Sequence, residues 1–238
     1  MPREIALLAS LQEFSLSQNA VSGGITQDLF SIEELKIVDL SFNNFTGSLP
    51  TNIGRFSTLE MLNVEQNSLS GSISDSLGSA IGIKSLNLGF NKFQGTIPST
   101  IFNLPILTEL QLQGNKLSGT IPTEISSLSM LTSLSLGPNL FTGTIEKSMN
   151  SLTNLRYLVI KGLDIDGQLP DSFGATLTNL VELTIADTHV YGSVSTSFGS
   201  LVKLTKLDFG NNMLQLKIPS ELGKLAQLSK FPSNLPLL

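Results

Sequence analysis

The chain has 238 residues, of which 40% are hydrophobic and only 14% carry a charged side chain. Its net charge of −5 argues against a nucleic-acid partner, because such binding depends on neutralising phosphates with Lys and Arg. The absence of cysteine excludes disulfides and thiolate metal sites. No apolar run approaches the ~20 residues of a membrane-spanning helix, so we expect no direct membrane insertion by this segment.

The first ten residues carry part of a pattern that returns later in the chain. Segment 2–11 matches segments 122–131 and 219–228, with proline, glutamate and apolar residues at the same places. The apolar run 5–9 is too short for the core of a secretory signal peptide. We therefore expect residues 1–10 to be a partial N-terminal repeat.

Asparagine marks the repeat. Seven asparagines share one position in it, and the first six stand 24 residues apart: Asn19, Asn43, Asn67, Asn91, Asn115, Asn139 and Asn212. A fixed period of about 20 to 50 residues is typical of stacked-repeat proteins. Nine copies fit, with strands expected near residues 16, 40, 64, 88, 112, 136, 160, 185 and 209.

The repeats suggest a simple domain organisation. We expect one repeat domain over residues 1–238, with the repeats at 11–228. Repeat arrays need polar terminal caps that hide the core. Segment 229–238 is largely apolar, so we expect it to be an uncapped C-terminal end, as in a fragment of a longer protein.

Each part of the repeat has a mechanical reason, which segment 107–128 (LTELQLQGNKLSGTIPTEISSL) illustrates. Its Leu-x-Leu core has the two-residue period of a short strand, and such strands stacked at ~4.8 Å form a parallel sheet. The asparagine that follows offers both a donor and an acceptor for buried backbone groups. Glycine permits the next bend, and proline fixes φ where the outer path begins. An α/β repeat solenoid is therefore expected.

The asparagine series lapses twice in the second half of the chain. Leu163 and Thr188 hold the asparagine position in the seventh and eighth copies. Leucine cannot make the side-chain hydrogen bonds, and threonine can make only some of them. The lapse is expected to be either drift that a long solenoid tolerates or a soft joint that shapes a partner site.

The string L-x-x-L-x-L-x-x-N-x-L/F-x-G-x-I-P-x-x-I/L-x-x-L, over residues 2–228, resembles the plant-type leucine-rich repeat family. This family includes ectodomains of receptor-like kinases and receptor-like proteins, and polygalacturonase-inhibitor-like proteins. The resemblance implies a right-handed superhelix of about nine 24-residue repeats with a parallel concave sheet and an irregular or 3₁₀ convex side. It also implies a second small sheet around the Gly-x-Ile-Pro segment.

The sequence contains few residues that could form a catalytic or cofactor-binding site. The single histidine, His189, lies near Asp187 and Ser195, so a nucleophile-base-acid set can be imagined. His189 nevertheless falls at an outward turn position of the repeat, where a solvated side chain is expected. There is no phosphate-binding loop and no cluster with metal-ligand spacing. We expect no catalytic residue, metal or cofactor, and hence no enzyme.

The outward positions of the strands form columns along the expected concave face. They hold seven acidic and two basic side chains, so their excess equals the whole net charge of −5. A focused field on such a face steers partners of opposite charge, and exposed aromatic side chains are typical of binding hot spots. The expected partner-binding residues are Ile37, Asp39, Phe42, Met61, Asn63, Glu65, Phe90, Glu109, Gln111, Tyr157 and Lys161.

These features favour a non-catalytic module that recognises a protein or peptide, basic or rich in hydrogen-bonding groups. The alternative is a secreted inhibitor of a cell-wall polysaccharide-degrading enzyme that uses the same face. The sequon Asn44-Phe45-Thr46 makes Asn44 a candidate for glycosylation. An extracellular or cell-surface location within a larger protein is expected, and a cytoplasmic one if the chain is complete as given.

Overall fold

A computed structural model describes residues 1–215 and 218–231. The chain divides into two compact units, Met1–Ser118 and Gly119–Leu238. The expected single domain over 1–238 stays a prediction, and most of the expected C-terminal end, residues 232–238, lies outside the described residues.

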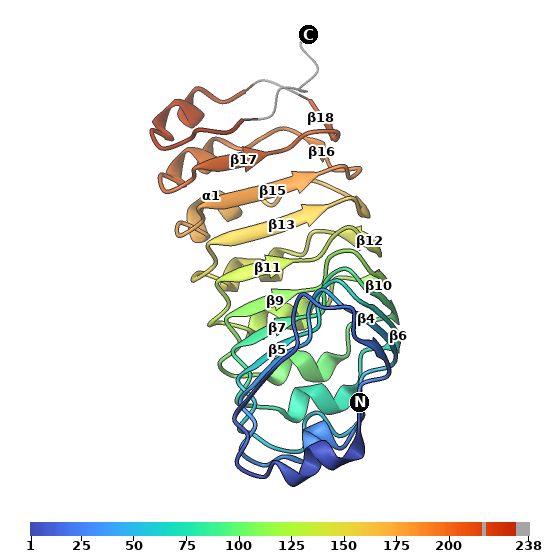
Figure 1. Ribbon diagram of the computed structural model, residues 1–238. Coiled ribbons are helices and arrows are strands. Elements are labelled where there is room, and N and C mark those ends of the chain that lie inside the picture. Colours follow the sequence, from blue (N-terminus) through green and yellow to red (C-terminus); the bar gives the residue numbers. More distant parts are fainter. Residues whose placement is uncertain (216–217, 232–238) are drawn as a thin grey trace. The chain divides into compact units, whose positions relative to one another are not determined.

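Unit 1 stacks one short strand per repeat into a parallel sheet (Figure 1). Its strands pair in sequence order and in register, so Val38, Leu62, Leu86 and Leu110 follow one another across the sheet. All four side chains are 0% exposed. The strands are β1 (Glu13–Ser15), β3 (Ile37–Asp39), β5 (Met61–Asn63), β7 (Ser85–Asn87) and β9 (Glu109–Gln111).

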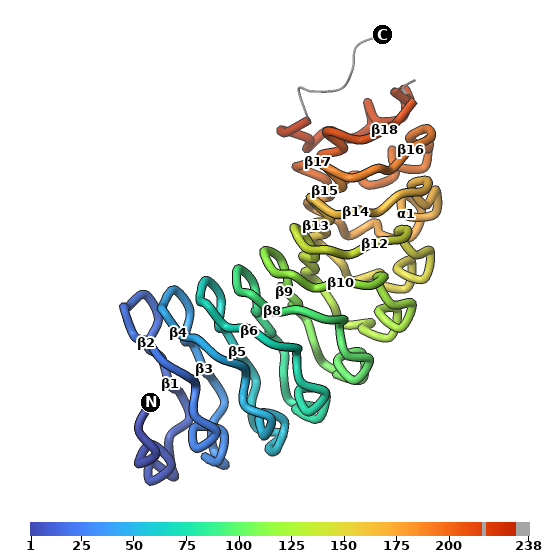
Figure 2. Tube along the Cα trace, turned by 90° about the vertical axis from the view of Figure 1, so that its right-hand side faces the viewer, coloured from blue at the N-terminus to red at the C-terminus, as the bar shows by residue number. Residues whose placement is uncertain are grey.

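In each repeat, the strand of the first sheet is followed by a strand of a second parallel sheet, as Figure 2 shows for β2, β4, β6 and β8. Its strands are β2 (Ser22–Gly23), β4 (Asn44–Gly47), β6 (Ser68–Ser72), β8 (Lys92–Gly95) and β10 (Lys116–Thr120). Short 3₁₀ segments close the turns at Arg3–Leu7, Leu29–Ser31, Asp75–Ser79 and Ser99–Asn103.

Unit 2 repeats this plan. Its first sheet contains β11 (Ser133–Ser135), β13 (Tyr157–Lys161), β15 (Glu182–Ala186) and β17 (Lys206–Asp208). On the other limb, β12 (Leu140–Thr144) pairs with β14 (Asp164–Asp166), and β16 (Tyr191–Gly192) pairs with β18 (Met213–Leu214). The helical segments are the 3₁₀ turns Thr123–Ser127, Lys147–Ser151, Thr196–Ser200 and Ser220–Lys224, and α1 (Phe173–Thr176). Stacked parallel strands connected through short 3₁₀ segments confirm the α/β repeat solenoid expected from the sequence.

The asparagines join neighbouring repeats through buried hydrogen bonds. Asn91 Nδ2 donates to the carbonyl oxygens of Val64 (2.8 Å), Leu88 (3.3 Å) and Gly89 (3.0 Å). Its Oδ1 accepts from the backbone N–H of Leu69 at 3.0 Å. One side chain therefore satisfies backbone groups of two successive repeats. The same pattern recurs at Asn43 and Asn67.

The two lapses in the asparagine series are filled differently. Leu163 is 3% exposed, so its side chain joins the core instead of binding the backbone. Thr188 is 5% exposed, and its hydroxyl donates to Asn212 Oδ1 at 2.5 Å. Asn212 also accepts from the Thr188 backbone N–H at 3.2 Å. The eighth copy thus keeps one polar link through threonine, as its chemistry permits.

In most repeats the residue before the asparagine position has a left-handed backbone, which the sequence pattern did not predict; Pro138, before Asn139, is an exception. In unit 1 the φ angles are 58° at Gln18, 54° at Phe42, 56° at Gln66, 51° at Phe90 and 72° at Gly114. Glycine and asparagine adopt this conformation readily, whereas a bulky aromatic residue does so rarely. The sequence did contain a signal for the left-handed backbone, because Gly114, Gly162 and Asn211 hold this position in other repeats.

Candidate functional site

The exposed side of the first sheet in unit 1 carries nine of the eleven expected partner-binding residues. The alternation of each strand turns Val38 and Leu62 into the core and leaves their neighbours on the surface. Seven of the nine expected residues are half-buried: Ile37, Asp39, Met61, Asn63, Glu65, Glu109 and Gln111. Phe42 and Phe90 are more open, at 45% and 44% exposed.

The face of unit 1 is acidic throughout. We call the outward positions of β1, β3, β5, β7 and β9, together with the three residues after each strand up to Gly114, the acidic face. Its charged residues are Glu13, Asp39, Glu65 and Glu109, with no lysine or arginine among them. None of the four carboxylates forms an ion pair with a basic residue of unit 1 in the described structure. The negative field is therefore uncompensated on this face.

Neutral neighbours hold three of these carboxylates in place. The backbone N–H and the hydroxyl of Ser41 donate to Asp39 Oδ1, at 3.0 and 2.6 Å. Asn87 Nδ2 donates to Glu65 Oε2 at 3.1 Å, and the Ser85 hydroxyl donates to Glu109 Oε2 at 2.8 Å. These bonds orient the carboxylates without neutralising them, so each keeps its charge for a partner.

Phe42 and Phe90 occupy the same left-handed position two repeats apart. Holding a bulky residue there costs on the order of 1–3 kcal/mol, which burial in a core would ordinarily offset. Here both rings remain nearly half exposed. Part of the Phe90 ring lies over Gly114, where an added Cβ would come within 2.5 Å of Phe90 Cδ1. The two rings thus combine packing on the sheet edge with an exposed apolar surface.

The corresponding face of unit 2 has a different electrostatic character. Both of its lysines are ion-paired, Lys161 with Asp187 at 3.4 Å and Lys206 with Glu182 at 2.5 Å. Thr184 is only 2% exposed although it lies on an outward position of β15. Tyr157 is 39% exposed, and the Arg156 guanidinium lies 5.7 Å from its ring centroid. Of the eleven expected residues, Tyr157 and Lys161 therefore belong to a nearly neutral surface.

Asp187 shows how these charges are compensated. A hydrogen bond from the Asn211 side chain, at 2.6 Å, lowers the pKa of Asp187. Partial burial opposes this change, and Lys161 adds to it. The lowered pKa keeps the carboxylate ionised and paired, which leaves it less available to a partner.

His189 does not join the catalytic set that the sequence allowed one to imagine. Its Nδ1 lies 3.1 Å from Asp164 Oδ1, and both side chains are more than half exposed. The carboxylate of Asp187 instead contacts Asn211 and Lys161, and the Ser195 hydroxyl accepts from the Ser197 backbone N–H at 3.3 Å. The geometry is that of solvated surface side chains.

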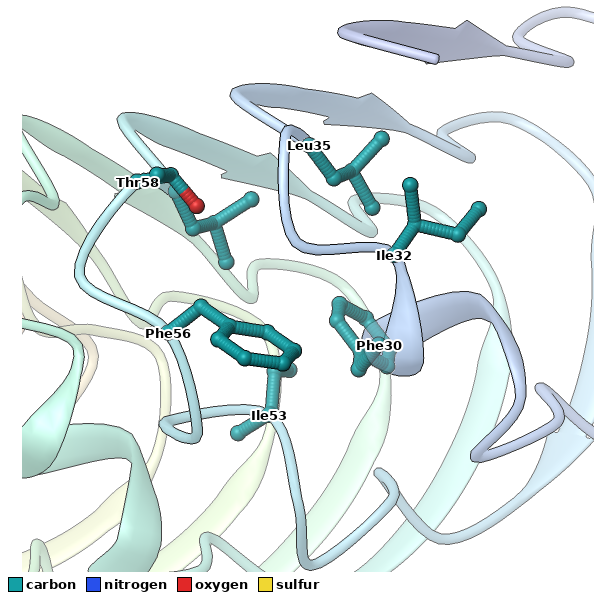
Figure 3. A pocket seen from close by; sticks show the side chains of 7 residues that line it. Phe30, Ile32, Leu35, Ile53, Phe56 and Thr58 are labelled. Atoms are coloured by element: carbon teal, nitrogen blue, oxygen red, sulfur yellow. The ribbon is translucent and has the colours of Figure 1, made fainter. Parts of the chain in front are cut away.

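A small apolar pocket opens on another part of unit 1 (Figure 3). The rings of Phe30 and Phe56 point toward one another across it, and its cavity volume is about 10 Å³. Ligand sites are commonly about 300–1,000 Å³ and contain several convergent polar groups. The one polar lining residue, Thr58, already donates its hydroxyl hydrogen to the Glu33 carbonyl at 2.8 Å. This pocket is therefore a packing irregularity between repeats.

Metal-ligand and membrane-spanning features are not found in residues 1–215 and 218–231. Within that range, no three His, Asp or Glu side chains are grouped as metal ligands would be. None of the described helices has the length and apolar character to cross a bilayer. Asn44, the sequon residue, is exposed on β4, and its backbone N–H donates to the Val21 carbonyl at 2.8 Å.

Comparisons with known proteins agree with this geometry. Family profiles described as leucine rich repeat match residues 34–56, 58–80, 81–141 and 203–225. A comparison with curated proteins finds no match.

Two solved plant structures are similar over 97% of this chain. One is the ectodomain of the Arabidopsis thaliana receptor kinase GASSHO1/SCHENGEN3 in complex with CASPARIAN STRIP INTEGRITY FACTOR 2, with 31% identity and a TM-score of 0.94. The other is the Arabidopsis receptor kinase HAESA in complex with the peptide hormone IDA and the co-receptor SERK1, with 31% identity and a TM-score of 0.90.

This chain spans only 28% and 38% of the lengths of those two structures. A plant ice-binding protein at 22% identity, with a TM-score of 0.71, shares the fold alone. The asparagine ladder, the paired parallel sheets and the profile matches together show that the chain belongs to the plant-type leucine-rich repeat family.

Proposed function

We propose that this chain is a non-catalytic recognition module that binds a peptide or protein through the acidic face. The observation that carries the proposal is the combination of four carboxylates, no basic residue and two exposed phenylalanines on one sheet surface. The similar HAESA receptor was solved with a peptide hormone, and the GASSHO1/SCHENGEN3 ectodomain with CASPARIAN STRIP INTEGRITY FACTOR 2, which supports the same use of the fold here. This chain spans less than half the length of those two structures, so its own residues carry the proposal about its ligand.

The proposed partner is basic. Glu13, Asp39, Glu65 and Glu109 form no ion pair in the described structure, so a ligand carrying lysine or arginine would supply an opposite charge. Charge complementarity of this kind raises association rates and rejects acidic competitors. Unit 2 supplies its own lysines, which makes its face a poorer cation site.

A display selection tests this proposal. Random peptides are selected on the intact chain at about 50 mM and about 300 mM salt, because exposed charge pairs weaken as ionic strength rises. We expect binders enriched in lysine and arginine, with the enrichment strongest at low salt. Recovery of no binders, or of binders without a basic bias, would contradict the proposed function.

The inhibitor alternative is not preferred. An inhibitor of a polysaccharide-degrading enzyme could use the same sheet face, but both plant structures described above are receptor kinases, and the HAESA structure is a complex with a peptide hormone.

An extracellular or cell-surface location within a larger protein is proposed from the receptor ectodomains and the exposed sequon. On expression through a secretory pathway, Asn44 is expected to carry a glycan, which mass spectrometry would detect. Thr46→Ala should remove the added mass. An unmodified Asn44 in the secreted protein would count against modification at this position.

A further inference from the structure

We propose that the acidic face binds a basic peptide in the polyproline II conformation, with successive turns of the peptide contacting Phe42 and Phe90. This inference rests on the proposed function and narrows the ligand to one conformation. The inference concerns the ligand's backbone as well as its charge, because the spacing of the two rings favours one backbone conformation of the peptide.

The ring spacing follows from the register of the sheet. Strands β3, β5 and β7 pair without a shift, so Phe42 and Phe90 lie two strand spacings apart. Two spacings of ~4.8 Å separate the rings by roughly 10 Å. One turn of a polyproline II helix is three residues at ~3.1 Å, or about 9.3 Å. A peptide lying across the strands in this conformation would place residues i and i+3 on the two rings.

Other backbone shapes fit this spacing less well. Side chains on one side of an extended strand recur at roughly 6.6 Å and then at roughly 13 Å, which misses the second ring. Residues i and i+7 of an α-helix are about 10.5 Å apart, but a helix is about 10–12 Å wide and presents a broad stripe. A polyproline II peptide is narrower and has three separate faces, so one can meet the rings while another meets the carboxylates.

The rings are held in place before the ligand arrives. Their left-handed φ values of 54° and 51° fix the direction in which each side chain leaves the backbone. Gly114 leaves room for the Phe90 ring to lie over the next repeat. Flat apolar surfaces of this kind are what grooves that bind proline-rich segments present to their ligands. Because the rings are positioned in advance, less ordering entropy is lost on binding.

The carboxylates of Asp39 and Glu65 lie on one side of the column of residues that contains Phe42 and Phe90. Asp39 and Glu65 come earlier in their strand-and-turn segments than Phe42 and Gln66, respectively, so both lie on the same side of that column. Hydrogen bonds from Ser41 and Asn87 orient them. A guanidinium group matches two carboxylate oxygens at once, so arginine is the preferred basic residue. The expected ligand pattern is therefore proline toward the rings and arginine toward Asp39 and Glu65.

Synthetic peptides with one composition and different spacing test this inference on the intact chain. The probes are five repeats of Pro-Pro-Arg, a scrambled peptide of the same composition, five repeats of Pro-Pro-Glu, and a helical Ala/Arg peptide of equal charge. Titration by fluorescence anisotropy should show the regular Pro-Pro-Arg peptide binding at least about 10-fold tighter than the scrambled and helical peptides. The Pro-Pro-Glu peptide should not bind.

Substitution of the rings gives a second reading. Phe42→Asn with Phe90→Asn should weaken binding of the Pro-Pro-Arg peptide by at least about 10-fold. Asparagine suits the backbone at these positions, since Asn211 adopts φ 54° at the equivalent position, and an unchanged melting temperature would confirm folding. Tyr191→Asn, at an exposed aromatic residue on β16 of unit 2, is the matched control and should change affinity less than about 2-fold.

The outcomes separate this inference from the proposed function. Equal binding of regular and scrambled peptides, preference for the helical peptide, or indifference to the ring substitutions would each overturn the polyproline II geometry. In all three cases a basic ligand still binds, so the proposed function stands. Failure of every basic probe, together with an empty display selection, would overturn both.

Discussion

Replacing Asn91 with alanine is expected to lower the free energy of unfolding by about 2–4 kcal/mol. The substitution removes the acceptor for the Leu69 N–H and the donor for the Val64, Leu88 and Gly89 carbonyls. Asn91 is 8% exposed, so water cannot easily replace these bonds. An unsatisfied buried polar group costs about 1–3 kcal/mol, and at least two such groups would remain. Urea denaturation followed by circular dichroism measures the change.

Asn87→Ala is the matched control in the same repeat. Asn87 is half-buried on the sheet face, where it bonds to Glu65 and to the Gly89 N–H. Because water reaches these groups, we expect a loss below about 1 kcal/mol. Equal losses at the two positions would show that the ladder bonds carry no special stability.

Reversing three carboxylates of the acidic face is expected to weaken binding of a basic peptide by about 100-fold or more. The variant carries Asp39→Lys, Glu65→Lys and Glu109→Lys. It replaces three attractive interactions with three repulsive ones, and the loss should shrink at high salt as the charges are screened. The Pro-Pro-Arg peptide is the probe, and anisotropy titration at two salt concentrations is the measurement.

The control variant carries the same change of net charge elsewhere on unit 1. Glu33→Lys, Glu34→Lys and Asp75→Lys alter three exposed acids that lie off the acidic face. We expect an effect below about 3-fold, because charges farther away than a Debye length of ~8–10 Å act weakly. If both triple variants lose binding equally, general charge attraction explains the affinity and the acidic face is not the binding site.

The pattern of the repeat could be predicted from the sequence because every repeat has the same alternation of buried and outward positions. The Leu-x-Leu alternation predicted which side of each strand is buried, and Val38, Leu62, Leu86 and Leu110 are all fully buried. The same alternation predicted that Asp39, Glu65 and Glu109 would face outward, and they do. The binding role of these residues stays a prediction.

The sequence alone determined the period, the parallel stacking and the asparagine series, because those depend on spacing that every repeat shares. Only the tertiary structure decided which charges remain free. Lys161 and Lys206 form ion pairs with Asp187 and Glu182 of neighbouring repeats, whereas the four carboxylates of the acidic face form no ion pair in the described structure. It also decided that Phe42 and Phe90 stay exposed on a left-handed backbone. Ion pairing and side-chain exposure depend on what the adjacent repeat places opposite each residue, and that is a property of the assembled stack.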